Sequence, residues 1–340
     1  MSERVVVVGG GIVGLSVAWA LQRRGRDVVV LERGRCGDGA SGAAAGMIGA
    51  LAELQGPGVP DPLMVASRAM WPRFARALEA ASGLAVEHAT SGIRVLANHP
   101  GVVEGHRAWA ASLQRQGFCA EVHDRTETLA AEPSAHPGTV GSLWLPGEAT
   151  VDNQEVVAAL RRVVTVHERT EVVAVSGEGA RTAEGDWPGT VIVAGGAWSA
   201  QLAGGSVKPV RGESIVVQGA PGLLRSALYG GGGYAVPRPD GRVILGATME
   251  DRGFDSTPSD EGAGQCRRIG AAIAPALAAL PVVEQRCGLR PTTRDHVPVI
   301  DQVRPGVWVC TGHYRNGIAL APASAALLAD RMLGPGGAPW

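Results

Sequence analysis

The chain has 340 residues, of which 45% are hydrophobic and 19% charged, and its formal net charge is -1. This length and composition are typical of a globular protein with roughly two domains and a substantial buried core. The balanced charge excludes a general nucleic-acid-binding surface, and no apolar run approaches the ~20 residues of a membrane span.

The first predicted elements are a strand and a glycine-rich turn. Val5 to Val8 is a run of β-branched residues typical of a buried parallel strand, and Gly9-x-Gly11-x-x-Gly14 follows it directly. Glycines at such a turn let backbone N–H groups approach a pyrophosphate, and the N-terminus of the next helix adds partial positive charge.

Apolar residues at helical spacing predict a helix that begins at Ile12 and ends at Gly25. A second strand, Val28 to Leu31, ends at Glu32, which has the spacing from Gly9 of an acidic group that binds a ribose. Because strand, glycines, helix, strand and acidic residue occur in order, we expect dinucleotide binding rather than a purely structural turn. The motif does not distinguish FAD from NAD.

Strand and helix recur after a long stretch of different character. Asp152 or Asn153 is predicted to cap a helix, and residues 190–202 contain a buried strand that ends in Gly195 and Gly196. Residues 86–146 and 210–290 instead contain short extended runs between turn residues, including the hairpin signal Pro239-Asp240-Gly241. The cofactor-binding domain is therefore predicted to be discontinuous.

The expected fold class is α/β plus antiparallel β. A Rossmann-like cofactor-binding domain is assigned to residues 1–85, 147–208 and 291–340. A mainly antiparallel substrate-binding domain is assigned to residues 86–146 and 209–290. Two-domain architectures of this kind usually bind their ligand at the domain junction.

Four consecutive glycines, Gly230 to Gly233, lie between Tyr229 and Tyr234 in the second extended region. A glycine run in a strand-rich segment marks a bulge, a sharp turn or a close approach to a ligand. The sequence around the run does not by itself decide among these three.

Cysteine usage and the N-terminus indicate the compartment. The five cysteines (Cys36, Cys119, Cys266, Cys287 and Cys310) are widely spaced, with no Cys-x-x-Cys pair and no zinc-ligand spacing. The N-terminal apolar run stops at glycines and lacks a signal-peptide cleavage site. We expect a reduced, cytoplasmic protein without a metal site, without a membrane or nucleic-acid partner, and forming a homo-oligomer.

Four segments together resemble glycine oxidases, within the D-amino-acid oxidase family of FAD flavoproteins. They are SGAAAGMIGALAE (41–53), YAVPRPDGRVILGATM (234–249), CGLRPTTRDHVPVI (287–300) and GHYRNGIALAPASAALLAD (312–330). The resemblance covers essentially the whole chain with its motifs in order. It implies non-covalent FAD and oxidation of an amine next to a carboxylate, by hydride transfer to flavin N5 and reoxidation by dioxygen, which yields hydrogen peroxide.

The resemblance also implies a set of cofactor contacts. Glu32 and Arg33 would contact the adenosine ribose, Val172 the adenine side, and the run His313 to Ala319 the isoalloxazine. The residues expected to bind the cofactor are Gly9, Gly11, Ile12, Val13, Gly14, Glu32, Arg33, Ala40, Ser41, Ala45, Gly46, Met47, Val172, Gly195, Gly312, His313, Tyr314, Arg315, Asn316, Gly317 and Ile318.

Substrate contacts follow from the same resemblance and from side-chain chemistry. Arg290 would pair with the substrate carboxylate, since a guanidinium can form two parallel hydrogen bonds with a carboxylate. The alternative is that Arg290 is an ordinary surface arginine. Tyr234 would add a phenol hydrogen bond, or serve as a core aromatic, and Met249 would form an apolar wall. Arg315 is expected to face either substrate or solvent.

A helix is predicted from about Gly317, with its N-terminus toward the flavin pyrimidine edge, and Pro322 predicts a kink or a later start. No residue is assigned as a catalytic acid or base. His296 and His313, like the other histidines, are expected to be structural or surface groups.

Gly230 to Gly233 mark the departure from the family, where bulkier or polar residues line the pocket mouth. Their missing side chains would widen the pocket beside Gly232, unless the segment is a mobile surface hairpin. The wider pocket predicts as substrate an N-substituted glycine unit, namely an N-carboxymethyl amino acid, in a specialised biosynthetic pathway, with glyoxylate and a primary amine as products.

Three alternatives stay open. A glycine oxidase of the usual kind would supply the imine for thiamine thiazole formation. An FAD-dependent amino-acid dehydrogenase would use an acceptor other than oxygen. A non-enzymatic FAD-binding or tRNA-modification protein would leave the convergence of Arg290, Tyr234 and Arg315 unexplained.

Overall fold

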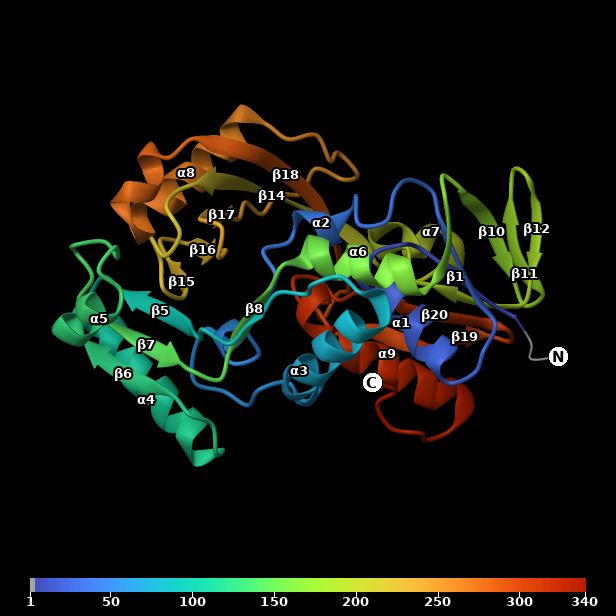
Figure 1. Cartoon of the computed structure of the whole chain (residues 1–340), viewed down its shortest axis with the longest axis horizontal. Coiled ribbons are helices and arrows are strands. Elements are labelled where there is room, and N and C mark those ends of the chain that lie inside the picture. The colour runs from blue at the N-terminus through green and yellow to red at the C-terminus, as the bar shows by residue number, and fades with distance from the viewer. Residues whose placement is uncertain (1–3) are drawn as a thin grey trace.

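The computed structural model describes residues 4–340, and over this range the chain forms four β-sheets. A six-stranded and an eight-stranded sheet lie toward opposite ends of the molecule, with the glycine-rich turn and α2 (Ala40–Ala43) between them (Figure 1). This arrangement confirms an α/β part joined to a mainly antiparallel part.

The six-stranded sheet has the order β19-β20-β13-β1-β2-β9. Neighbours are parallel from β20 to β9, and β19 is an antiparallel edge strand. The bounds are β1 Val5–Val8, β2 Val28–Glu32, β9 Thr165–Glu168, β13 Thr190–Val193, β19 Val299–Arg304 and β20 Val307–Thr311. Strands from three distant parts of the sequence therefore meet in one sheet.

Both faces of this sheet are covered, which explains the unbroken valine run of β1. Val5 and Val7 belong to the core shared with the helices, whereas Val6 and Val8 pack on the opposite side with Val172 and Ala180. A strand that alternates between two buried faces needs apolar residues at every position. The helices are α1 Ile12–Arg23, α3 Pro62–Ser82, α6 Asn153–Val163 and α9 Gly317–Leu333; the other face carries α7 Ser199–Ala203 and the sheet of β10 Val172–Ser176, β11 Gly179–Thr182 and β12 Gly185–Pro188.

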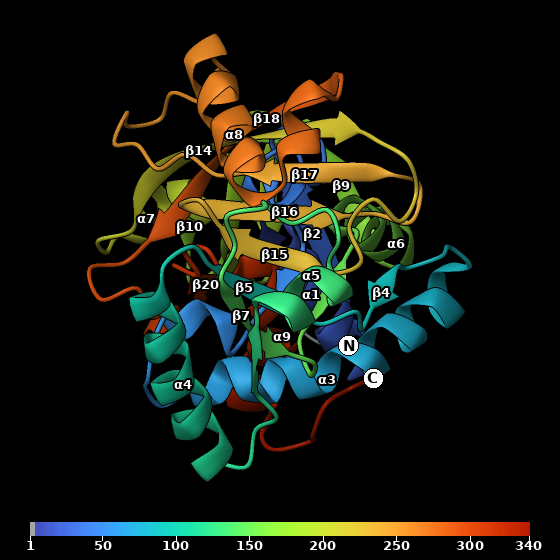
Figure 2. The same cartoon turned by 90° about the vertical axis from the view of Figure 1, so that its left-hand side faces the viewer.

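The eight-stranded sheet has the order β18-β14-β17-β16-β15-β5-β7-β6, and most of its strands follow one another down the view of Figure 2. Its pairs are antiparallel except that β15 runs parallel to β5. At this pair the strands from residues 93–145 join those from residues 208–292. The bounds are β5 Ile93–Ala97, β6 Glu121–Asp124, β7 Gly141–Leu145, β14 Lys208–Gln218, β15 Ala227–Gly230, β16 Gly233–Pro237, β17 Arg242–Gly246 and β18 Val282–Thr292. The predicted sheet and the Pro239-Asp240-Gly241 hairpin between β16 and β17 are confirmed.

Helices cover this second sheet on both faces. Ile215 and Val217 pack with α8 (Asp260–Ile273), whereas Val216 packs with Trp109 and Leu113 of α4 (Pro100–Arg115). The remaining elements are α5 Arg125–Ala131, η1 Ala52–Leu54, η2 Gly196–Trp198, η3 Pro275–Ala279, and a small sheet of β3 Met47–Ile48, β4 His88–Ala89 and β8 Ala149–Val151. The exact domain boundaries given above stay a prediction.

Helix α9 begins at Gly317 and continues through Pro322, so the expected later start is wrong. A proline in the helix removes one N–H donor and disturbs the preceding turn. Here α3 compensates: the Ala319 carbonyl accepts hydrogen bonds from Ser67 Oγ (2.6 Å) and Trp71 Nε1 (3.0 Å), and the Ala323 N–H donates to Ser67 Oγ (3.3 Å). Side chains of a neighbouring helix thus satisfy the backbone around the proline.

Candidate active site

A cavity of about 500 Å³ lies between the two large sheets. The ends of β1, β2 and β13 contribute Val8, Leu31 and Ala194 to its lining, and the eight-stranded sheet contributes residues of β14, β16 and β18. A crevice at the carboxyl ends of parallel strands is where open α/β sheets bind their ligands. The predicted position of the pocket, at the junction of the two parts, agrees with this cavity.

The glycines after β1 bring backbone close to the cavity floor. Gly9 has a φ of +114°, and a Cβ atom there would lie 2.5 Å from the Ala194 carbonyl oxygen. Gly14 does not line the cavity; a Cβ there would lie 2.0 Å from the Gly9 carbonyl oxygen, so this glycine lets α1 pack against the turn. The glycine spacing therefore serves both close approach to a ligand and close helix packing.

Two helix N-termini face the same cavity. Gly11 precedes α1 and Asn316 precedes α9, and neither provides a side-chain hydrogen bond that caps its helix. The first backbone N–H groups of a helix carry partial positive charge and attract anionic groups. Ser41 Oγ of α2 accepts from the Ile12 N–H (3.0 Å), which brings α2 against the first of these termini.

Glu32 holds the turn between β1 and α1. Its carboxylate accepts hydrogen bonds from the N–H groups of Gly10 (2.7 Å) and Gly34 (2.8 Å). Beside it, the Arg33 guanidinium lies 3.7 Å from the ring centroid of Trp198, which in turn packs against Phe254 at 5.4 Å. Trp198 was not predicted as a site residue. Its position just after Gly195 and Gly196, which follow β13, could have indicated it.

Nearly all of the residues expected to bind the cofactor line this one cavity. The two exceptions are Gly14, described above, and Gly312, whose φ of +81° turns the chain between β20 and His313. Ala319 also lies outside the lining and packs in a small core with Ala50 and Met64. The structure therefore brings the predicted set together, while the contact that each residue makes stays a prediction.

Arg290 of β18 lies at the end of the cavity that faces the eight-stranded sheet. Its guanidinium is half-buried, and Nη1 donates weakly to the carbonyl oxygens of Thr248 (3.2 Å) and Arg211 (3.3 Å). A Cβ atom at Gly212 would lie only 2.0 Å from Nη1, so the missing side chain there makes room for the guanidinium. Across residues 4–340, no carboxylate lies within 4.0 Å of Arg290.

Tyr234 of β16 lines the same end of the cavity. Burial raises the pKa of its phenol, and the nearby Arg290 only partly opposes that shift, so the hydroxyl is a protonated donor. A Cβ atom at Gly246 would lie 2.7 Å from this hydroxyl, so the glycine makes room for the phenol. Among the described residues, no group forms a hydrogen bond with the Tyr234 hydroxyl. The Tyr234 hydroxyl is therefore available to a ligand.

Glu53 lines this end of the cavity, whereas Tyr229, which is hydrogen-bonded to it, lines an adjoining cavity; neither was predicted as a site residue. The Tyr229 hydroxyl donates to Glu53 Oε1 (2.6 Å), and Arg315 Nη2 lies 3.4 Å from the same oxygen. Burial and the Glu53 carboxylate raise the pKa of Tyr229 well above its usual value. The Arg315 side chain, half-buried and lining the cavity, is thus held by Glu53 rather than extended into bulk solvent.

The four glycines form a tight hairpin turn. Gly230 pairs with Gly233, and Gly231 and Gly232 between them have φ values of +58° and +83°, as a two-residue turn of the favoured type requires. Side chains at Gly231 and Gly233 would collide with Ala272 and with the Gly246 carbonyl oxygen, whereas one at Gly232 would meet nothing within 4 Å. The expectation that all four missing side chains widen the pocket is therefore wrong, since only Gly232 clearly faces open space.

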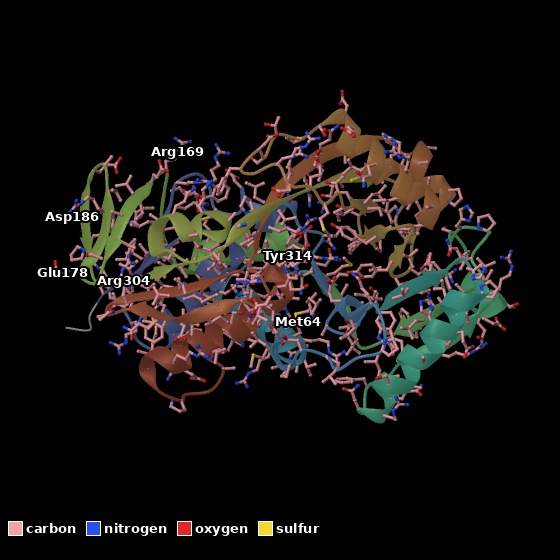
Figure 3. The ribbon with its side chains drawn as sticks, turned by 180° about the vertical axis from the view of Figure 1, so that it is seen from behind. Met64, Arg169, Glu178, Asp186, Arg304 and Tyr314 are labelled. Atoms are coloured by element: carbon pink, nitrogen blue, oxygen red, sulfur yellow. The ribbon has the colours of Figure 1, made fainter. Side chains whose placement is uncertain are left out.

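Met249 and Tyr314 mark the mouth of the cavity. Met249 is 57% exposed, which is more than the buried apolar wall we expected, and its sulfur accepts from the Tyr314 hydroxyl (3.3 Å). Tyr314 lies near the middle of the molecule in Figure 3, and its ring stacks on His296 at 4.4 Å. Both stacked residues have positive φ, an unusual conformation for side-chain-bearing residues that clusters at functional sites.

His313 lines the cavity from within the core, where its Nε2 lies 3.0 Å from Ser324 Oγ. Burial lowers the pKa of this imidazole from 6.5 to about 4. It is therefore neutral near pH 7, as expected for a structural group rather than a catalytic base.

The buried His313 predicts a loss of stability in acid. Between pH 6.5 and about 4 the unfolded chain binds a proton at this position that the folded chain does not, so stability falls as the pH drops. The contribution approaches about 1.4 kcal/mol per pH unit within that window. The free energy of unfolding, measured with denaturant at several pH values from 4.5 to 7, should change less steeply with pH for His313→Gln than for the wild type. Equal pH dependence in the two proteins would contradict this assignment.

A model of the family "DAO: FAD dependent oxidoreductase" matches residues 4–331. The chain belongs to the DAO family of FAD-dependent oxidoreductases. It is 36% identical over 353 residues to a glycine oxidase of Pseudomonas aeruginosa, a match that covers 98% of this chain and 96% of the relative. The crystal structure of glycine oxidase from Geobacillus kaustophilus matches with a TM-score of 0.91 at 30% identity, over 97% of this chain and 95% of the other. A bifunctional ThiO/ThiG protein of Nostoc is 32% identical over 97% of this chain but 52% of its own length.

The cavity of this DAO-family protein fits FAD on structural grounds. Glycines such as Gly9, where a Cβ atom would collide with neighbouring backbone, let a ligand approach the main chain closely. The N-termini of α1 and α9, whose own N-cap residues form no side-chain cap, supply positive potential for a pyrophosphate and for an electron-rich ring edge. None of the helices within residues 4–340 combines the length and the apolar character needed to cross a bilayer. Over the same residues, no His, Cys, Asp or Glu group is arranged to hold a metal ion.

Proposed function

We propose that this DAO-family protein oxidises the methylene of a glycine unit, and that its preferred substrate is an N-substituted glycine. The observation that carries the proposal is Arg290, a half-buried guanidinium that lines the cavity without a carboxylate partner among residues 4–340. Partial burial of a guanidinium without a counter-ion costs solvation free energy, which a bound anion would offset. The free hydroxyl of Tyr234 beside it is the second donor that a carboxylate would use.

The side chains of the site orient the substrate, and the Glu53 carboxylate at this end of the cavity already accepts a hydrogen bond from Tyr229 and pairs with Arg315. When bound, FAD would supply the two-electron acceptor for the hydride. Tyr229 and Tyr234 stay protonated, and His313 is neutral and hydrogen-bonded to Ser324. The positive charges of Arg290 and Arg315 favour the neutral amine, which is the form that can lose a hydride.

The products follow from the atom balance. Loss of hydride from the methylene carbon and of a proton from nitrogen gives an imine, and water then adds to that carbon. The carbon–nitrogen bond breaks, glyoxylate leaves with the former methylene carbon, and the substituent leaves as a primary amine. Dioxygen takes up the two electrons and two protons as hydrogen peroxide.

One observation supports a glycine unit as the reacting part, and another supports a substituent on its nitrogen. The relatives reported above include proteins named glycine oxidase at 30% identity or more over nearly the whole chain. The open space beside Gly232, next to Tyr234, supports an extension on the amine nitrogen. Glycine itself is the competing substrate, because it makes the same carboxylate contacts without using that space.

A substrate panel tests the proposal. With the FAD-loaded enzyme, N-substituted glycines are expected to show a kcat/KM at least about tenfold above that of glycine, a difference of about 1.4 kcal/mol in transition-state binding. Peroxide formation and oxygen uptake should be measured with glycine, sarcosine and N-benzylglycine. Glycine as the best substrate would contradict the N-substituent, and flavin bleaching without oxygen uptake would indicate a dehydrogenase.

A further inference from the structure

A second cavity, of about 530 Å³, adjoins the first. Gly232, Gly233 and Arg315 line both cavities, so the two meet at the glycine hairpin. The second cavity extends from there between β5, α4 and the loop that follows η1. It uses none of the residues expected to bind the pyrophosphate or the adenine, and neither the substrate carboxylate nor the cofactor accounts for it.

The lining of this second cavity is largely apolar and carries little charge. It includes Pro57, Val95, Leu96, Val102 and Trp109, and it contains no Asp or Glu residue. Its full positive charge comes from Arg315, which is already paired with Glu53. His106 is buried there, and desolvation lowers the pKa of its imidazole, so it adds no charge near pH 7. Such a surface favours uncharged ligand groups over acidic or basic ones.

We propose that the second cavity binds the substituent on the amine nitrogen of the substrate, and that this substituent is an uncharged, apolar group of aromatic or branched aliphatic type. The inference rests on the proposed oxidation of a glycine unit. The carboxylate lies at Arg290 and Tyr234 in that proposal. Gly232, two residues before Tyr234, lines both cavities, and no atom lies within 4 Å of the position its Cβ would take. Burial of an apolar group there strengthens binding in proportion to the area removed from water.

The substrate comparison uses three glycine derivatives that share the carboxylate and differ at nitrogen. N-benzylglycine carries an aromatic group, sarcosine a methyl group and iminodiacetate a second carboxylate. With the FAD-loaded enzyme, kcat/KM for N-benzylglycine is expected to exceed that for sarcosine by about tenfold to hundredfold. Iminodiacetate is expected to react more slowly than N-benzylglycine, because its second carboxylate would lie in a largely apolar lining whose one arginine is already paired with Glu53.

Gly105 offers a variant that fills the second cavity without touching the first. It lies in α4 and lines the second cavity, and a Cβ atom there would meet nothing within 4 Å. Leucine is also a better helix former than glycine, so Gly105→Leu is expected to fold. Ala108→Leu adds bulk at an exposed position of the same helix outside both cavities and is the matched control.

Gly105→Leu is expected to lower kcat/KM for N-benzylglycine about tenfold and to leave sarcosine unchanged, while Ala108→Leu changes neither. The inference is overturned if N-benzylglycine reacts no faster than sarcosine, if iminodiacetate reacts best, or if Gly105→Leu affects both substrates equally. In each of these cases the oxidation of sarcosine still supports the proposed function. If no glycine derivative bleaches the bound flavin, the proposed function and the inference fail together.

Discussion

Replacement of Arg290 by methionine is expected to lower kcat/KM for a carboxylate-bearing amine between about 30-fold and about 4,000-fold. This range corresponds to about 2–5 kcal/mol, the usual cost of removing one partner of a hydrogen-bonded charge pair that is shielded from water. Methionine keeps much of the length of the arginine stem, so the loss reports the charge and its hydrogen bonds. The bound flavin should stay in place, because the only hydrogen bonds of the Arg290 guanidinium within residues 4–340 are two weak ones to carbonyl oxygens.

Two further variants sharpen this result. Arg290→Lys keeps the positive charge but loses the planar fork, so it should fall between wild type and Arg290→Met. Arg294→Met removes an exposed arginine four residues along the chain, outside the cavity, and should leave the kinetics unchanged. Steady-state rates and the flavin absorbance spectrum decide the matter. Full turnover by Arg290→Met with FAD bound would remove the carboxylate role.

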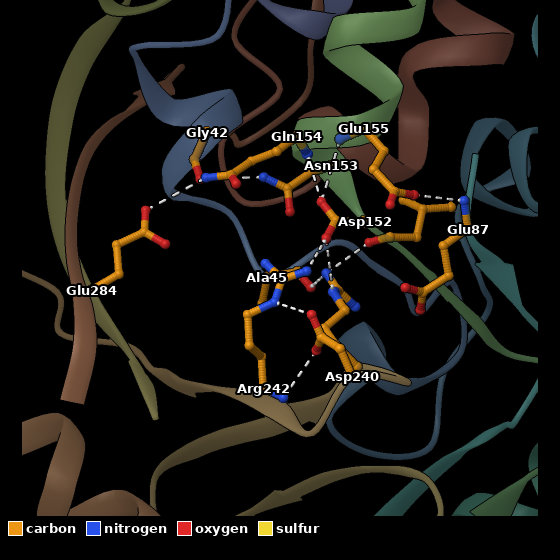
Figure 4. A network of polar contacts seen from close by, with 12 residues as sticks. Gly42, Ala45, Glu87, Asp152, Asn153, Gln154, Glu155, Asp240, Arg242 and Glu284 are labelled. Carbon is orange, nitrogen blue, oxygen red and sulfur yellow. Dashed lines mark hydrogen bonds and ion pairs between the residues drawn. The ribbon is translucent and has the colours of Figure 1, made fainter. Parts of the chain in front are cut away.

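Replacement of Asp152 by alanine is expected to destabilise the protein by about 3–5 kcal/mol, which corresponds to a fall in Tm of about 4–7 °C for a chain of this length. Asp152 Oδ1 caps α6 by accepting from the N–H groups of Gln154 (2.9 Å) and Glu155 (3.3 Å), as predicted for this position. Its other oxygen accepts from Arg242 (3.1 Å) and lies 3.6 Å from Nε of Arg238 (Figure 4). One carboxylate therefore serves a helix terminus and two arginines.

Arg238 makes this loss large. Its side chain is only 1% exposed, and Asp152 is the carboxylate within 4.0 Å of it in the described chain. Its Nη2 donates to the carbonyl oxygens of Ala45 (3.0 Å) and Val151 (2.8 Å), which ties the cavity-lining loop at Ala45 to the eight-stranded sheet. Without Asp152 the buried guanidinium loses its counter-charge, so weaker FAD retention should accompany the lower stability.

Asp152→Asn separates the two roles of this residue. Asparagine caps helices about as well as aspartate, so this variant keeps the cap and removes only the charge. If the ion pair with Arg238 dominates, Asp152→Asn should lose most of the stability that Asp152→Ala loses. Thermal unfolding followed by flavin fluorescence measures both the Tm and the release of FAD. An unaltered Tm for Asp152→Ala would contradict the assignment.

The N-terminal part of the fold could be predicted because its signals are local. The valine run of β1, the glycine spacing and the position of Glu32 lie within one short stretch. Taken together, these three signals indicate a single structure, a dinucleotide-binding turn between strand and helix. The cap at Asp152 and the hairpin at Pro239 to Gly241 are equally local and are confirmed. The two positive-φ glycines of the second hairpin fit the same kind of rule, but their sequence context also allowed a bulge.

Long-range contacts account for what sequence analysis missed. Tyr229 and Glu53 are 176 residues apart, and nothing near either residue indicates the hydrogen bond between them. The parallel pairing of β15 with β5 likewise depends on how two distant segments meet. The later helix start allowed for Pro322 was wrong for the same reason, since Ser67 and Trp71, whose hydrogen bonds to the Ala319 carbonyl support the helix there, belong to α3.

The strand order of the six-stranded sheet has a consequence for synthesis of the chain. β1 lies between β2 and β13, so one edge of its valine run stays unpaired until residues 190–193 have left the ribosome. β20, the next strand outward, follows more than a hundred residues later. An apolar strand with an open edge is a template for pairing with other chains. During translation the protein should therefore depend on chaperones that shield its N-terminus, and a nascent chain stopped before residue 190 should aggregate more readily than one stopped after residue 311.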